Sequence, residues 1–139
     1  MSRENVEVVR RLFDLLEAGM ERGDLGSWTE SEDLADDFEW IPPPGIPGLG
    51  IYRGREGFLE FMRTWTEDFE DWSVELEQAF DAAPDRVAGI VRQRAIGKAS
   101  AAPVELQQGM VWEFKDGRVI RIRHFLSPSQ ALEAAGLSE

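Results

Sequence analysis

The sequence of 139 residues contains no cysteine, one histidine and one tyrosine. Without cysteine the chain has no disulfide, no thiolate nucleophile and no Cys-ligated metal site, so cysteine usage does not constrain the cellular compartment. One histidine among scattered carboxylates is also a poor ligand set for a transition metal. We therefore expect neither a metal site nor a cofactor.

Long apolar runs and an excess of basic residues are also lacking. No segment approaches the roughly 18 consecutive apolar residues of a membrane span, and residues 1–13 lack the apolar core of a signal peptide. The net charge of −12, from 27 acidic and 15 basic side chains, would repel nucleic acids and anionic membranes. We expect a cytoplasmic protein that binds neither.

The periodicity of the apolar residues predicts one α+β domain over residues 1–139. Helices are expected from Arg3 to Glu21, from Ser27 (through a Ser27–Glu30 capping box) to about Asp36, from Arg55 to about Asp71, and from the Ser127 cap to Ala135. Strands are expected at residues 37–41, 73–81 and 86–98, and two more, joined by a turn, within residues 105–126. Residues 42–50 are rich in Pro and Gly and predict a loop. The last four strands would follow one another antiparallel, with the helices covering one face of the sheet.

Residues 105–128 form the most informative stretch, a hairpin that turns at Asp116-Gly117. Alternation along its second strand puts Ile120, Ile122, His124 and Leu126 on one face. The histidine thus lies in an apolar row. The other face carries Val119, Arg121, Arg123 and Phe125, which with Val111 would leave apolar groups exposed on the outside of the sheet. We expect that outer face to form a homodimer interface.

Three short segments occur in a familiar order: LADD at 34–37, RGREG at 53–57 and FKDGRV at 114–119. Together they resemble the SnoaL-like group of the nuclear-transport-factor-2-like superfamily over nearly the whole chain. The resemblance implies an α+β cone, in which a curved, mostly antiparallel sheet wraps helices around a deep apolar pocket, and often a homodimer. Activities in that superfamily include ketosteroid isomerisation, polyketide cyclisation, epoxide hydrolysis and dehydration, and many members are not enzymes.

The residues that carry isomerase chemistry in the superfamily are missing here. Leu16 stands at the position of the family's tyrosine, Pro42 at that of the general base, and Met110 at that of the protonated acid. Steroid isomerisation by the known route is therefore excluded. Of the epoxide hydrolases' Asp–Arg–Asp arrangement, Arg92 or Arg94 with Glu105 could imitate only a part. The resemblance carries the fold and not the chemistry.

His124 is the candidate catalytic residue, since a neutral imidazole can exchange a proton near neutral pH. Asp37, Glu39 and Glu113 are possible orienting partners, and the sequence does not choose among them. The alternative is a histidine satisfied by a carbonyl or carboxylate that merely fills the cone. Arg92 and Arg94 share a face and could reach an anionic ligand group, or simply balance the acidic surface.

Aromatic residues predict the wall of a pocket for a small apolar, cyclic ligand. Phe13, Phe38, Phe58 and Phe61 could contribute to it, or the aromatic rings could simply fill the core. The pocket residues expected besides His124 are Leu16, Trp40, Phe61, Trp65, Gln108, Met110, Trp112 and Ile122. Two hypotheses follow: a cofactor-free isomerase, cyclase or hydrolase that uses His124 as acid or base, and a non-catalytic ligand-binding or dimerisation module.

Overall fold

The computed structural model describes residues 2–43 and 50–137. Its elements in chain order are α1 (Ser2–Arg22), a 3-10 helix η1 (Ser27–Glu30), β1 (Leu34–Ile41), β2 (Tyr52–Arg53), α2 (Gly54–Asp68), β3 (Phe69–Ala83), β4 (Arg86–Gly97), β5 (Pro103–Lys115), β6 (Arg118–Phe125) and α3 (Pro128–Ala134). In this part of the chain the strands form one six-stranded sheet of order β2-β1-β6-β5-β4-β3. The α+β class is confirmed.

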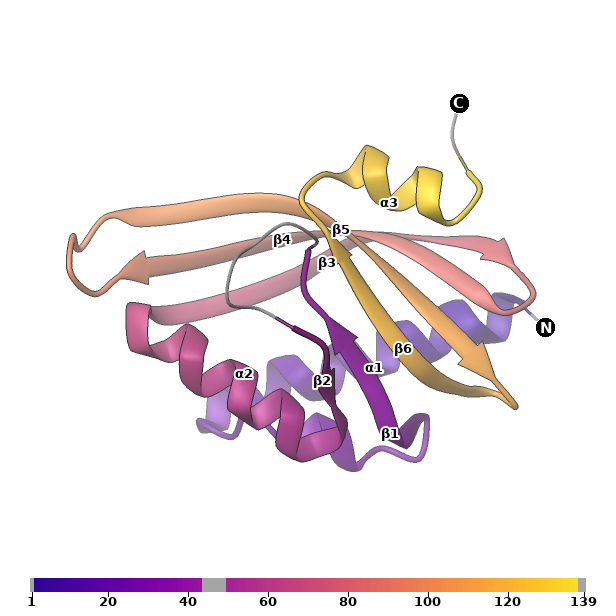
Figure 1. Ribbon diagram of the computed structural model, residues 1–139, viewed down its shortest axis with the longest axis horizontal. Coiled ribbons are helices and arrows are strands. Elements are labelled where there is room, and N and C mark those ends of the chain that lie inside the picture. The colour runs from indigo at the N-terminus through magenta and orange to yellow at the C-terminus, as the bar shows by residue number, and fades with distance from the viewer. Residues whose placement is uncertain (1, 44–49, 138–139) are drawn as a thin grey trace.

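The sheet curls around helices α1 and α2, which lie on its inner face (Figure 1). Strands β3 to β6 pair antiparallel in succession, as the sequence predicts. Strand β1 runs parallel to β6 and brings Trp40 beside Ile122. The larger of two clusters of buried apolar side chains lies between α1, α2 and the inner face. No helix in the described residues is long and apolar enough to cross a membrane.

The turn between β5 and β6 follows the prediction from the Asp-Gly pair. Asp116 and Gly117 both have positive φ, 54° and 80°, as a two-residue hairpin turn of the favoured twist requires. Beyond the turn, Glu113 pairs with Arg121 and Phe114 with Val119, so β6 has one extra residue at Ile120. Because of this bulge, side chains at the start of β6 point to the opposite side of the sheet from the one that alternation predicts. Val119 is buried in the inner core, and its assignment to the outer face was wrong.

Helix α3 lies on the opposite, outer face of the sheet (Figure 1), so the prediction that all helices cover one face is wrong. Ser127 caps α3 by accepting a hydrogen bond from the backbone N–H of Gln130, as expected. Gly109 allows a close approach, because a Cβ there would lie 2.4 Å from the Cβ of Ala131. Val111 and Phe125 are consequently buried under α3. They are not exposed, which removes the apolar argument for a homodimer interface; the homodimer itself stays a prediction.

Several boundaries differ from the sequence-based expectation. The helix predicted to reach Asp36 is only the 3-10 turn η1, whose N-cap is Gly26 without a side-chain hydrogen bond, and β1 already begins at Leu34. Helix α2 ends at Asp68 instead of Asp71, because the chain enters the long strand β3 at Phe69. The short strand β2 was not foreseen. Most of the predicted loop at 42–50, its residues 44–49, falls outside the described residues.

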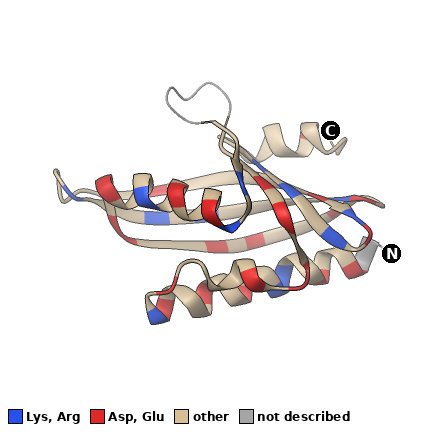
Figure 2. Cartoon of the chain, turned by 60° about the horizontal axis from the view of Figure 1, so that its bottom comes forward, with Lys and Arg blue, Asp and Glu red and all other residues tan. Residues whose placement is uncertain are grey.

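Acidic and basic residues are interspersed along α1 and α2 (Figure 2). On the outer face of the sheet, other acidic and basic side chains form ion pairs across neighbouring strands. Arg92 lies 2.8 Å from Glu77, and Arg121 lies 2.8 Å from Glu39. A hydrogen bond from Arg121 lowers the pKa of Glu39 below its ordinary value. The part of the outer face that α3 does not cover therefore carries charged side chains that form ion pairs with one another.

Candidate functional site

A cavity of about 390 Å³ lies between the inner face of the sheet and helices α1 and α2. Its volume is within the range of small-molecule sites. All nine side chains that the sequence analysis assigned to the site line this cavity: Leu16, Trp40, Phe61, Trp65, Gln108, Met110, Trp112, Ile122 and His124. The structure thus brings them together around one space, while their binding and catalytic roles stay predictions.

Aromatic rings form much of the wall. Trp65, from the last turn of α2, stacks on Phe69 with ring centroids 4.5 Å apart. On the sheet, Trp112 lies over Gly89, where a Cβ would be only 2.6 Å from the indole ring. Phe13 of α1 meets Trp112 edge-on at 5.7 Å. A wall of this kind presents flat apolar surfaces to a ligand.

Two of the phenylalanines proposed for the wall do not line the cavity. Phe38 and Phe58 are almost completely buried in the core. Both rings contact Trp28, and Phe58 also contacts Trp40 at 4.9 Å. For Phe38 and Phe58 the alternative interpretation, that aromatic rings simply fill the core, is confirmed. Phe13 and Phe61 do line the cavity.

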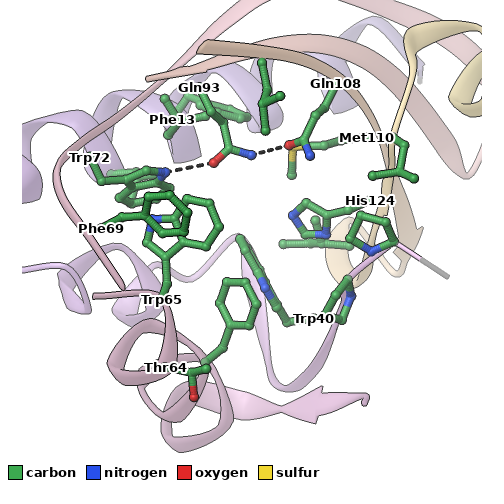
Figure 3. Close-up of a pocket in the computed structure, with 18 of the residues that line it drawn as sticks. Phe13, Trp40, Thr64, Trp65, Phe69, Trp72, Gln93, Gln108, Met110 and His124 are labelled. Atoms are coloured by element: carbon green, nitrogen blue, oxygen red, sulfur yellow. Dashed lines mark hydrogen bonds between the residues drawn. The ribbon is translucent and has the colours of Figure 1, made fainter. Parts of the chain in front are cut away.

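Trp72 and Gln93 are polar members of the lining that the sequence analysis did not single out. The indole Nε1–H of Trp72 donates to Oε1 of Gln93 at 2.8 Å. Nε2 of Gln93 donates to Oε1 of Gln108. Figure 3 shows this chain along one side of the cavity. The sequence did indicate that Gln93 faces the cavity, because alternation places this uncharged amide on the face opposite Arg92 and Arg94.

His124 reaches into the cavity from β6 (Figure 3) and is 7% exposed. Its Nδ1 lies 2.9 Å from the backbone oxygen of Ile41 on β1. A carbonyl can only accept, so Nδ1 carries the proton and Nε2 carries a lone pair. Burial lowers the pKa of His124 from 6.5 to about 4, although the hydrogen bond to Ile41 opposes this change. The ring is therefore neutral at pH 7, with its plane 54° from that of Trp40.

The three carboxylates considered as partners of His124 lie elsewhere. Glu39 and Glu113 both bind Arg121 on the outer face, and Asp37 is exposed to solvent. None of these possible partners orients His124, because alternation along β1 and β5 turns their side chains away from Trp40 and Trp112; the structure instead has the alternative, a histidine satisfied by a carbonyl. A backbone carbonyl takes that role instead.

Arg92 and Arg94 are also directed away from the cavity. Arg92 pairs with Glu77, and Arg94 pairs with Glu105 at 2.6 Å. The Arg94–Glu105 pair exists, as the comparison with epoxide hydrolases suggested, but it lies on the outer face and cannot act on a molecule inside. Of the two alternatives for these arginines, reaching an anionic ligand group is wrong, and balancing acidic neighbours is confirmed.

Few polar groups face the cavity. Among its lining residues in the described part of the chain, only Asp68 and His124 have titratable side chains, and none is Lys or Arg. The Nε1–H groups of Trp40 and Trp65 are buried without a hydrogen-bond acceptor. Within residues 2–43 and 50–137 no group of three or more His, Asp or Glu side chains could hold a metal ion.

Comparisons with known proteins identify the fold. The family model of the SnoaL-like domain matches residues 9–122. A nuclear-transport-factor-2-like protein of unknown function from Burkholderia pseudomallei has a TM-score of 0.72 at 20% identity, over 94% of this chain and 95% of that one. TerC, co-crystallised with polyporic acid, has a TM-score of 0.72 at 19% identity, over 96% and 98%. A protein from a Jannaschia species, provisionally named a SnoaL-like polyketide cyclase, has a TM-score of 0.69 at 24% identity, over 88% and 85%. A comparison with curated proteins finds no match.

Proposed function

The chain belongs to the SnoaL-like domain family, and from this premise we propose that it binds a small, neutral, ring-containing molecule in its internal cavity. The observation that carries the proposal is a cavity of about 390 Å³ with aromatic walls and polar groups from only a few side chains. Apolar walls supply the affinity, and a few placed polar groups fix the orientation of the ligand. The co-crystallisation of TerC with polyporic acid supports a small-molecule ligand.

The charges of the protein favour a neutral ligand over an anionic one. The lining has no Lys or Arg in the described residues, and it includes Asp68. The net charge of −12 adds a repulsive field for anions. An anion would lose its hydration in the cavity without meeting a cation, which is costly.

Filling the cavity from α1 tests the proposal. Leu16 is buried and faces the cavity, whereas its neighbour Leu15 is 43% exposed. We expect Leu16→Trp to weaken binding of 2-naphthol by about tenfold or more, because the indole occupies the space of the ligand, while Leu15→Trp binds like the wild type. Equilibrium dialysis measures both. Equal binding by the two variants would place the ligand outside the cavity and contradict the proposal.

A second candidate function is cofactor-free proton transfer, with His124 as general base. The observation that favours it is Nε2, which carries a lone pair and has no partner among the described residues. In such a step a C–H bond next to a ligand carbonyl breaks, its electron pair forms an enolate, and the proton goes to Nε2. Because the pKa of His124 is lowered to about 4, this base is weak and its rate gain is at the lower end for such catalysis.

Deuterium exchange distinguishes this candidate from binding alone. With 2-tetralone in heavy water, a catalytic His124 exchanges the protons next to the carbonyl about a hundredfold faster than buffer does. His124→Gln, which keeps a polar side chain in place of the imidazole, loses this acceleration. Proton NMR follows the exchange. If the wild type exchanges no faster than buffer although 2-tetralone binds, the protein has no such activity and only the binding function stands.

A further inference from the structure

The amide of Gln108 has a fixed orientation, set by a hydrogen-bond chain that begins at Trp72. An indole nitrogen can only donate, so the oxygen of Gln93 faces Trp72 and its NH₂ group faces Gln108. The oxygen of Gln108 is thereby engaged, and its NH₂ group is left over. Within residues 2–43 and 50–137 that nitrogen has no acceptor. Gln108 therefore presents donors, and not its oxygen, to the cavity.

His124 presents the opposite polarity a short distance away. Its Nδ1–H is held by the carbonyl of Ile41, so Nε2 offers a lone pair. His124 pairs with Met110 across β5 and β6, and Gln108 lies two residues from Met110 on the same face. Diagonal neighbours of this kind are within reach of each other's longer side chains. Figure 3 shows both side chains entering the cavity opposite Trp65, Phe69 and Trp72.

The Gln108 NH₂ group, as donor, and Nε2 of His124, as acceptor, both have fixed roles and together select the polar group of a ligand. We propose that the cavity recognises a hydroxyl on a flat ring, a neutral phenol or enol, whose O–H donates to His124 Nε2 while its oxygen accepts from Gln108 Nε2. This inference deepens the proposed function and rests on it. A single hydroxyl carries the donor and the acceptor that the two side chains require.

Other polar groups leave one partner unsatisfied. A ketone or ether oxygen accepts from Gln108 but offers nothing to the lone pair of His124. A phenolate or carboxylate has no proton to donate to that lone pair, and its charge meets no Lys or Arg in the described lining of the cavity. An ammonium group leaves the Gln108 donors without an acceptor. A buried polar group without a partner costs binding free energy, so the cavity discriminates among these ligands.

Three matched probes test the inference: 2-naphthol, its methyl ether and naphthalene. By equilibrium dialysis at pH 7, where a phenol is neutral, we expect the wild type to bind 2-naphthol about tenfold more tightly than either of the others. Gln108→Leu removes the donor and abolishes this preference. Equal binding of all three probes by the wild type overturns the inference and leaves the proposed function standing. Failure of the wild type to bind any of them overturns both.

A pair of tryptophan variants tests the chain that orients Gln108. Trp72→Phe keeps an aromatic ring in the wall but frees Gln93 and Gln108 to turn over, so the preference for 2-naphthol over naphthalene falls several-fold. Trp65→Phe is the matched control, because the indole N–H of Trp65 has no acceptor; it changes the affinity for both probes alike and leaves their ratio unchanged. Circular dichroism and thermal unfolding verify that each variant is folded. An equal effect of the two substitutions on the ratio contradicts the proposed orienting role of Trp72.

Discussion

Phe58→Ala lowers the free energy of unfolding by about 3–5 kcal/mol, at the upper end of the effects expected from a single substitution in a core. The Phe58 side chain is 0% exposed and lies on the inner side of α2. Its ring meets Trp28 edge-on at 5.0 Å and Trp40 at 4.9 Å. Removing it leaves a cavity that these rigid rings cannot close, so both the buried apolar area and the aromatic contacts are lost.

Urea denaturation of the wild type and the variant measures this loss. Phe80→Ala is a matched control, because Phe80 on β3 is only partly buried and belongs to neither apolar cluster. We expect the control to cost about 1 kcal/mol. Equal losses in the two variants would contradict the central place of Phe58 in the core. Because Phe58 supports Trp40, whose ring lies 4.3 Å from that of His124, the change also loosens one wall of the candidate site.

We expect the buried His124 to lower the free energy of unfolding by about 3 kcal/mol when the pH falls from 7 to 4. Burial lowers its pKa from 6.5 to about 4 in the folded chain, and this difference corresponds to about 3 kcal/mol. As the pH falls below 6.5 the unfolded chain takes up a proton that the folded chain does not. The stability is therefore complete above pH 6.5, declines through the window down to about pH 4, and changes no further on account of His124 below that.

Comparison with His124→Gln isolates this contribution. Carboxylates such as Glu39, whose pKa is lowered by Arg121, also destabilise the folded chain in acid, but they do so equally in both proteins. The difference between the two stability curves, from urea denaturation at several pH values, should change by about 3 kcal/mol. Parallel curves would show that the folded chain admits a proton to His124 as readily as the unfolded one. Since the ring stays neutral above about pH 5, its lone pair remains available to a ligand throughout the neutral range.

Local patterns in the sequence were sufficient to predict most helices and strands and nine of the residues that line the cavity. The apolar spacing in residues 3–21 predicted α1, and the Asp116-Gly117 pair predicted the hairpin. Strict alternation put Gln108, Met110 and Trp112 on one face of β5 and His124 on the matching face of β6, and the structure has them around one cavity. These features depend on residues a few positions apart, where the periods of the helix and the strand are enough to assign a side chain to a face.

Only the tertiary structure determined the partners of those side chains. The extra residue at Ile120 turned Val119 inward, and α3 covered Val111 and Phe125 on the other face. The bond from His124 to Ile41 spans 83 residues, and the Trp72–Gln93–Gln108 chain joins three strands. Strand register, bulges and the seating of a helix on a sheet are set by how segments distant in the sequence fit together. The sequence by itself thus determined which strand faces surround the cavity and many of the residues on them. The protonation state, tautomer and amide orientation of these residues were decided by long-range contacts, because a hydrogen-bond role depends on the atom at the other end of the bond.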